Sequence, residues 1–341
     1  MPPLVRLLAK RLGTSLIVLI GVSILIFAIA RVIPGDPARI ALGPNATADA
    51  VAVLREKLHL NESVVAQYGY FVSDLAQGDL GVSLYTNRPV TTDIAEFLPA
   101  TMELVIISGL MMVLLGVPLG IISARYRGTW VDHAARFVTL LGVSAPGFVW
   151  AVILMLLFSY FTHFFPIAGR VSDSITVTPV TGFMLVDTLI AGDFAAFGDA
   201  IWHIILPAFA LALSGIGQAA RLVRSNMVET YDKPYIEMAE AYGFPERKIA
   251  RKYAFRPSMI PSLTIIGLDF ASMLGNAFLV EFVYAWPGLS KYGVAVILRK
   301  DLNAIVGTVL IISAMFLIVN IIVDFMVSII NPRIRLSQRA S

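Results

Sequence analysis

Polar side chains recur at helical spacing inside three long apolar segments of the sequence, where they are costly and seldom incidental. They form three sets: Ser214, Gln218 and Arg221; Asp269, Ser272 and Asn276; and Asn320, Asp324 and Ser328. Each set falls on one helical face. Polar groups inside apolar helices usually face a bundle interior or a water-filled cavity and mark the route of a solute. The spacing therefore predicts a polar passage lined by Gln218, Asp269, Ser272, Asn276 and Asn320.

Two carboxylates in these sets have alternative roles. Asp269 is the one charged residue of its segment, so it is expected either to attract an ammonium group or other cation, or to be a neutral, hydrogen-bonded acid. Asp324 lies near the end of its segment, where we expect it to pair with Arg221 or to cap the basic end of the helix. Glu103, at the edge of another segment, is expected at the membrane interface.

The chain contains no pattern typical of catalysis or metal binding. Its four histidines have no mutual spacing of three or four residues, and it has no cysteine. The sequence also lacks the G-x-x-x-x-G-K-[ST] loop that cradles nucleotide phosphates. We therefore predict no catalytic site, no metal site and no cofactor held by this chain.

The elements that must position the polar sets are membrane-spanning helices. Only 14% of the 341 residues are charged, against about 25% in soluble domains. Six apolar segments approach the roughly 20 residues that a helix needs to cross a bilayer, and they comprise residues 12–30, 104–124, 137–162, 200–220, 257–280 and 302–323. The sequence predicts an all-α polytopic membrane protein with six transmembrane helices. We expect a kink at Pro146-Gly147, and close packing along Gly267, Ala271 and Gly275.

The distribution of Lys and Arg predicts the orientation. Basic residues gather near the N-terminus, at 125–136, within 221–256 and after residue 332, all of which share one side if the six segments cross in turn. Cytoplasmic loops carry the excess of positive charge, so both termini are predicted to be cytoplasmic. The pI near 9.1 then reflects topology rather than nucleic-acid binding. The apolar run of 12–30 exceeds the 7–15 residues of a signal peptide, so we expect it to be a retained span.

Three outer segments join the spans. The first is expected to carry surface helices at 47–58 and 62–76, with Thr47 and Asn61 as N-caps and Gly78 as a stop. The segment 164–199 shows little periodicity, and 281–301 contains Trp286-Pro287-Gly288, which is typical of a turn. We expect all three to form a cap over the outer mouth. No internal repeat is evident, which disfavours an inverted-repeat secondary transporter.

A polar, basic insert at 221–256 separates two spans. Pro234 suits the first turn of a helix, Gly243 suits its C-terminal stop, and Pro245 begins a second helix expected over 246–254. The resulting elbow has an apolar corner. We interpret it as a docking site for a soluble partner; the alternative is an amphipathic helix lying on lipid headgroups.

The elbow carries a resemblance. Glu237-x-x-Glu240-Ala241-x-Gly243, followed by Pro261, resembles the EAA loop of the permeases of ATP-binding cassette (ABC) importers. Four further segments resemble the B-type permease of dipeptide, oligopeptide and nickel importers, and they are Ile33-Pro34-Gly35-Asp36-Pro37, Gly78-Asp79-Leu80-Gly81-Val82-Ser83, Trp286-Pro287-Gly288-Leu289 and Asn331-Pro332-Arg333-Ile334-Arg335. Asp269 departs from the Gln that is more usual in such permeases.

The resemblance implies a type I importer fold in the bacterial cytoplasmic membrane. It implies a heterodimer with a second permease, two cytoplasmic ATPase subunits that bind ATP and Mg, and an extracytoplasmic substrate-binding protein. The residues implied in ATPase coupling are Glu237, Glu240, Ala241, Gly243, Phe244, Pro245 and Arg247. Among them, Phe244 is expected to fill an ATPase pocket and Glu240 to pair with Arg247.

The resemblance also suggests boundaries and a substrate. We expect a first span at 1–33, an outer helical loop at 34–97, a core of five spans at 98–335 that includes the coupling loop 221–260, and a tail at 336–341. A short peptide is the expected solute; a nickel chelate, glutathione, an opine or an oligosaccharide are alternatives. A secondary ion-coupled transporter is the alternative of another class, and a scaffold without a pore is a third.

Overall fold

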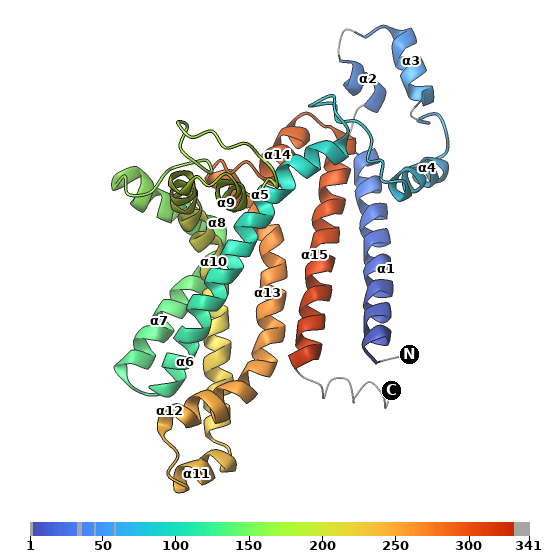
Figure 1. Cartoon of the computed structure of the whole chain (residues 1–341). Helices are drawn as coiled ribbons and strands as arrows, with labels where there is room; N and C mark the ends of the chain where they lie inside the picture. Colours follow the sequence, from blue (N-terminus) through green and yellow to red (C-terminus); the bar gives the residue numbers. More distant parts are fainter. Residues whose placement is uncertain (1–2, 33–35, 44–45, 58, 331–341) are drawn as a thin grey trace.

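The computed structural model describes residues 3–32, 36–43, 46–57 and 59–330, and these are largely helical (Figure 1). Extended pairing within them is limited to one isolated bridge between Val82 and Pro89. The helices are α1 (Pro3–Val32), α2 (Pro37–Leu42), α3 (Ala48–Lys57), α4 (Val64–Ala76), α5 (Val90–Met111), α6 (Val117–Arg125), α7 (Trp130–Ser144), α8 (Gly147–Leu154), α9 (Met184–Ile190), α10 (Phe194–Tyr231), α11 (Pro234–Ala241), α12 (Glu246–Lys248), α13 (Arg256–Val283), α14 (Leu289–Leu298) and α15 (Leu302–Ile330). The all-α prediction is confirmed.

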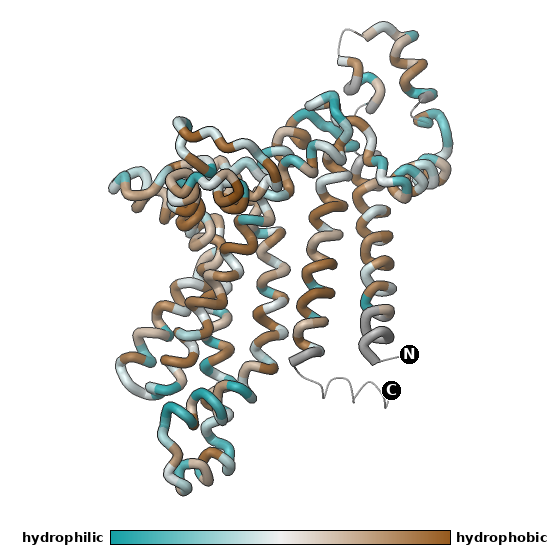
Figure 2. The backbone as a smooth tube through the Cα atoms, viewed as in Figure 1, coloured by the Kyte–Doolittle hydropathy of each residue, from teal (hydrophilic) through white to brown (hydrophobic). Residues whose placement is uncertain are grey.

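Among the described residues, five helical stretches are long and apolar enough to cross a membrane: those containing α1, α5–α6, α10, α12–α13 and α15. A sixth candidate is the pair α7 and α8, which bends by 103° at its break. The apolar residues fill the middle of the spanning helices and the polar ones gather at their ends (Figure 2). The second span begins at Val90 rather than near residue 104, and π-helical turns continue three of the spans.

The predicted kink at Pro146-Gly147 is a complete break. Ala145 is extended (φ −136°, ψ 151°) and Pro146 precedes the first residue of α8. The ring of a proline disfavours helical backbone at the residue before it, so α7 must end at Ser144.

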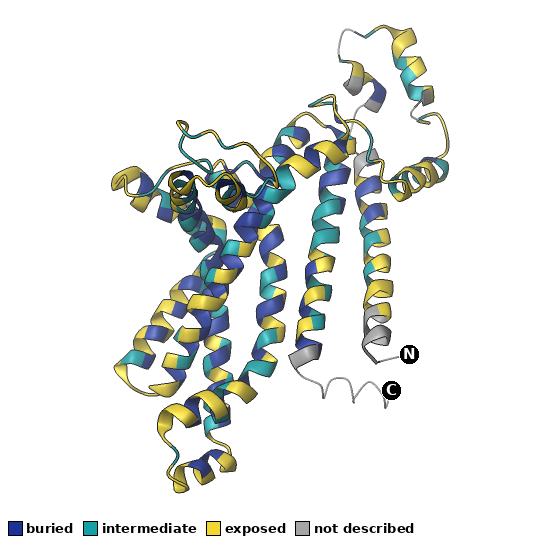
Figure 3. Ribbon diagram, viewed as in Figure 1, coloured by how far each residue is buried: buried dark blue, intermediate teal, exposed yellow. Residues whose placement is uncertain are grey.

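α10 is the central helix of the bundle, with 67% of its apolar window buried against 17% for α1 (Figure 3). Glycines bring its neighbours into backbone contact: a Cβ at Gly120 of α6 would lie 2.6 Å from the carbonyl oxygen of Ala220, and one at Gly142 of α7 would lie 2.6 Å from that of Leu213. Helices α6, α7 and α10 therefore pack as one close unit.

The small-residue face of α13 is shorter than predicted. Gly267 approaches Val323 of α15 closely, and Ala271 is fully buried. Gly275 is exposed, and a Cβ there would meet nothing within 4 Å. The close α13–α15 contact thus ends one turn before Gly275.

Helix α1 lies beside α15 at the edge of the bundle (Figure 1). Ile26 packs with Val306 and Leu310, and the ring of Phe27 lies 5.3 Å from that of Tyr68 in α4. The α2–α4 unit is therefore fixed to the bundle through α1 and α4. The division of the chain at residues 33, 97 and 335 stays a prediction, and the tail at 336–341 lies outside the described residues.

The surface helices of the first outer segment form nearly as expected, as α3 and α4, but one cap differs. Thr47 accepts a hydrogen bond from the backbone N–H of Ala50 (3.3 Å), as predicted. Asn61 does not cap α4; Ser63 does, accepting from the N–H of Ala66. Gly78 follows α4 with φ +78°, which suits the predicted stop. The sequence reading missed the short helices α2, α9 and α14.

These outer segments gather at the end of the bundle opposite α11 and α12 (Figure 1). We call the two ends the cap end and the elbow end. The cap end is joined by buried carboxylates. Glu103, predicted at the interface, is buried at 4% exposure, where it pairs with Arg170 and accepts from the N–H of Leu185 (2.8 Å). It ties the segment before α10 to α5.

Asp187 fixes the turn before α9. Burial raises the pKa of its carboxyl group, but hydrogen bonds from the hydroxyl and backbone N–H of Thr181 and from neighbouring backbone donors outweigh burial, so the pKa is lowered. The carboxylate is therefore the form that the fold stabilises at neutral pH.

Asp301 binds the end of the Gly78–Ser83 motif. One of its carboxylate oxygens accepts from the hydroxyl of Ser83 (2.7 Å) and the N–H of Leu84 (2.6 Å), while Gly81 leaves space for Asn303. The motif therefore joins the loop before α5 to the start of α15.

We expect Asp301→Ala to lower the stability of the protein by at least about 2 kcal/mol, because each buried donor left without an acceptor costs about 1–3 kcal/mol. Thermal unfolding in detergent measures this as a lower Tm. The matched control is Asp74→Ala, since Asp74 is exposed. An equal Tm for Asp301→Ala and the control would contradict the role of Asp301.

Candidate functional site

The elbow is built around α11. Pro234 is its first residue, as predicted. At its other end Gly243 adopts φ +73°, and its N–H donates to Glu240 O (2.8 Å) while that of Phe244 donates to Ala239 O (3.1 Å). These two bonds form a Schellman motif, which satisfies the last carbonyls of the helix and turns the chain sharply.

We expect Gly243→Val to open this end of the elbow, because a side chain in the left-handed region costs about 1–2 kcal/mol. Limited proteolysis should cut the variant faster between residues 241 and 248. Gly275→Ala is the control, since that glycine is helical and has open space around it. Equal cleavage of both variants would contradict the requirement for glycine at 243.

The second half of the elbow differs from the prediction. The helix that starts at Glu246 does not end near residue 254; it passes through a π-helical segment, Ile249–Phe255, directly into α13. Glu240 and Arg247 form no ion pair with each other among the described residues. Glu246 pairs instead with Arg125 of α6 (2.9 Å).

The residues predicted for ATPase coupling all lie on the elbow, and all but Phe244 are exposed. Phe244 is half-buried and stacks on Tyr253, with ring centroids 5.7 Å apart. The ammonium of Lys248 lies 4.0 Å from its ring centroid. Phe244 therefore closes the inside of the elbow.

The sequence predicted an apolar corner on the elbow, but not the exposed apolar face that extends from it along α11. Tyr235, Met238 and Tyr242 are 40%, 57% and 75% exposed, and their spacing places them on one side of α11. Ile236 and Ala239, on the other side, are buried. The apolar residues of α11 were evident in the sequence. The sequence alone does not show which side of this helix packs on the protein and which side is exposed. We call Tyr235, Met238 and Tyr242 the elbow face.

The predicted polar passage is partly assembled. Gln218 of α10 donates to one oxygen of Asp269 in α13 (2.8 Å). The other oxygen of Asp269 is buried and has no hydrogen-bond partner within the described part of the chain. Ser272 and Asn276 follow on α13 and are exposed. We call these four residues the polar seam.

The third polar set behaves differently. Asn320 donates to Phe316 O of its own helix (2.9 Å), and Ser328 is buried and donates to Phe325 O (2.8 Å). Asp324 pairs with Arg11 of α1 (2.9 Å) rather than with Arg221. The set on α15 therefore fastens α1 instead of extending the polar seam.

Comparison with known proteins matches nearly the whole chain. Residues 116–336 match the family described as "Binding-protein-dependent transport system inner membrane component". Residues 4–105 match its companion N-terminal family. The chain belongs to this family. It is an integral inner-membrane protein with the type I ABC importer permease fold, as the resemblance implied.

Three relatives are similar over the full length of this permease. A probable D,D-dipeptide transport system permease protein of Escherichia coli is 39% identical, covering 96% of this chain and 97% of the relative. A dipeptide transport system permease protein of Alkalihalophilus pseudofirmus is 37% identical, with 96% and 98% covered. A di/tripeptide transport system permease protein of Pseudomonas aeruginosa is 36% identical, with the same coverage.

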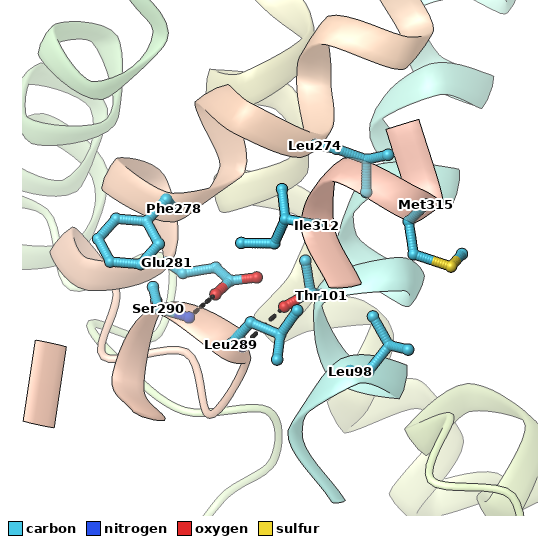
Figure 4. A pocket seen from close by; sticks show the side chains of 9 residues that line it. All are labelled: Leu98, Thr101, Leu274, Phe278, Glu281, Leu289, Ser290, Ile312 and Met315. Carbon is cyan, nitrogen blue, oxygen red and sulfur yellow. Dashed lines mark hydrogen bonds between the residues drawn. The ribbon is translucent and has the colours of Figure 1, made fainter. Parts of the chain in front are cut away.

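The Trp286-Pro287-Gly288-Leu289 segment of the permease closes a buried cluster at the cap end. Trp286 donates from its indole to Ala100 O (2.9 Å), and Thr101 accepts from the N–H of Leu289 (2.8 Å). Glu281 is fully buried and accepts from the N–H of Ser290 (2.9 Å) (Figure 4). A side chain at Gly288 would collide with Glu281 and Thr101.

The cavity beside this cluster is too small for a peptide. Its volume is ≈ 10 Å³, which is room for about one water. Apart from Thr101, Glu281 and Ser290 its lining is apolar (Figure 4). The cluster therefore locks α5, α13 and α14 together and is not a solute site. The Asn331–Arg335 segment of the resemblance and residues 33–35 lie outside the described residues.

Proposed function

We propose that this permease forms half of a membrane passage for short peptides and is driven by ATPase subunits that bind its elbow. The observation that carries the proposal is the elbow face: three large apolar side chains stand exposed on a rigid helix beyond the end of the spans. No described part of the chain covers them. The printed names of the relatives support a peptide as the solute.

The orientation follows from charge and from the arrangement of the helices. The N-terminal end of α1, the C-terminal end of α15 and the elbow lie at one end of the bundle (Figure 1). The basic residues of 125–136 and 221–256 belong to the same end. Positive loops are cytoplasmic, so the elbow end faces the cytoplasm with both termini, and the cap end faces outward.

The polar seam supports a second permease as partner. Asn276 is exposed on a membrane-spanning helix, where lipid would leave its amide unsatisfied. Ser272, exposed beside it, donates to Asp269 O of its own helix (2.9 Å). A second, homologous permease across a shared passage would supply both a protein surface and water. Asn320 of α15 is the remaining residue that we place in this passage.

The remaining partners follow from the family's mode of transport. An extracytoplasmic binding protein delivers solute to the cap end, and two cytoplasmic ATPases bind ATP and Mg, with hydrolysis carried out by those subunits. An ion-coupled carrier is disfavoured, because Asp324 is already paired with Arg11 and a carrier has no need of the elbow. A nickel chelate, glutathione, an opine or an oligosaccharide remain the alternative solutes.

Purification from the native host membrane tests the proposal. We expect mass spectrometry to identify a second permease and ATPase subunits bound to this chain in detergent, and a binding protein after addition of peptide. Recovery of this chain alone, together with uptake driven by an ion gradient, would contradict the proposal.

A further inference from the structure

The turn between α6 and α7, residues 126–129, contacts both sides of the elbow. It lies at the elbow end beside α12 (Figure 1). Arg127 of the turn pairs with Asp232 (3.2 Å), the C-cap residue that follows α10. Arg125, at the end of α6, pairs with Glu246 (2.9 Å), the residue that begins α12. The two carboxylates are the two feet of the elbow, one before α11 and one after it.

The turn itself is held rigidly by Asp132 of α7. This carboxylate is 1% exposed. Arg224 of α10 donates to both of its oxygens (2.7 and 2.8 Å). The hydroxyl of Ser123 (2.7 Å) and the N–H of Gly128 (3.0 Å) donate to it as well. A buried bidentate pair with further hydrogen bonds fixes both partners in one geometry.

Close backbone packing between α6 and α10 also fixes the turn to this part of the bundle. A Cβ at Gly120 of α6 would lie 2.6 Å from Ala220 O and 2.8 Å from Val223 Cβ of α10. Glycine at this position therefore lets α6 lie in direct backbone contact with α10. The turn is thus part of the α6–α7–α10 unit, and Arg125, just before it, extends from that unit to Glu246 of α12.

The Arg125–Glu246 and Arg127–Asp232 pairs are exposed. Exposed ion pairs contribute little to folding stability. Their placement has another effect. Because Glu246 begins a helix that runs without a break into α13, the Arg125 pair connects the start of that helix to the α6–α7–α10 unit. The Arg127 pair holds Asp232, the C-cap of α10, to the same turn.

We infer that the α6–α7 turn is a clasp that fixes the spacing between the two feet of the elbow. Arg125 and Arg127 are its positioning residues. A displacement of α11 by an ATPase then reaches α10 and α13 together, and α6 and α7 move with them. Without the clasp, the ATPase would displace α11 without moving α10 and α13 together. This inference rests on the proposed function.

The test is the number of ATP molecules hydrolysed per peptide taken up, measured with the whole complex in proteoliposomes. For the Arg125→Glu, Arg127→Glu double variant we expect the ATPases to remain bound and hydrolysis to change by less than about twofold. Peptide uptake should fall about fivefold or more, which is the lower range of measured coupling between sites. Arg251→Glu is the matched control, because Arg251 is exposed at the same end and makes no ion pair among the described residues.

Charge exchange separates coupling from general damage. Arg125→Glu and Glu246→Arg should each raise the ratio of ATP to peptide, and the two together should restore it; Arg127→Glu and Asp232→Arg should behave likewise. A wild-type ratio in the double variant, loss of its ATPases, or failure of both exchanges to restore the ratio would overturn the clasp. A wild-type complex without ATPases would overturn the proposed function itself.

Discussion

Replacing Met238 and Tyr242 with Asp is expected to remove the ATPase subunits from the complex. Both side chains are more than half exposed on the elbow face. Large apolar and aromatic anchors at the centre of an interface contribute about 2–4 kcal/mol each, and a buried unpaired carboxylate adds a desolvation cost. The amount of ATPase that co-purifies should fall at least tenfold, as measured by quantitative mass spectrometry.

The control for this variant is Leu298→Asp at the cap end. Leu298 is 79% exposed, close to the 75% of Tyr242, so the change in surface chemistry is matched. This control should retain its ATPases. Wild-type recovery of ATPases with the Met238→Asp, Tyr242→Asp variant would mean that the elbow face is not the docking surface.

The second large effect is expected at Asp269. One of its oxygens is held by Gln218, and the other is buried without a partner in the described chain. If the passage opens at this point, that oxygen is free to accept from the ammonium group of a peptide. Hydrogen bonds to charged groups contribute about 1.5–3 kcal/mol, so Asp269→Asn should lower the uptake of peptides with a free amino terminus about tenfold or more.

Two readouts isolate the role of the charge. Asp269→Glu retains the carboxylate and should keep most of the uptake, while assembly with the ATPases should be unchanged in both variants. Equal uptake by Asp269→Asn and wild type would show that Asp269 is a structural hydrogen-bonding acid, the alternative reading of its sequence.

The spans and the elbow were predictable because their signals are local. Apolar runs fix the positions of helices in a bilayer. Pro234 and Gly243 mark the start and the stop of α11, and each signal lies at the end of the helix that it defines. Local signals fail where two candidates compete. Asn61 and Ser63 both suit an N-cap, and the structure uses Ser63 because α4 begins at Val64.

The partners of the charged residues were not predictable, because they lie far apart in the sequence. Asp324 was expected to pair with Arg221 or to cap the basic end of its helix, yet α1 packs beside α15 and supplies Arg11. Arg125 and Glu246 likewise stand 121 residues apart in the sequence and meet only in the folded chain. A stripe of polar residues predicts that a helix face is polar, but not whether a passage or another helix lies opposite.

ATP-driven peptide uptake by the purified complex in proteoliposomes tests the central claim most directly. With the binding protein outside and ATP inside, we expect uptake that requires ATP, persists without an ion gradient and is abolished by the Met238→Asp, Tyr242→Asp variant. Uptake that follows an ion gradient and ignores both ATP and that variant would contradict an elbow-driven permease.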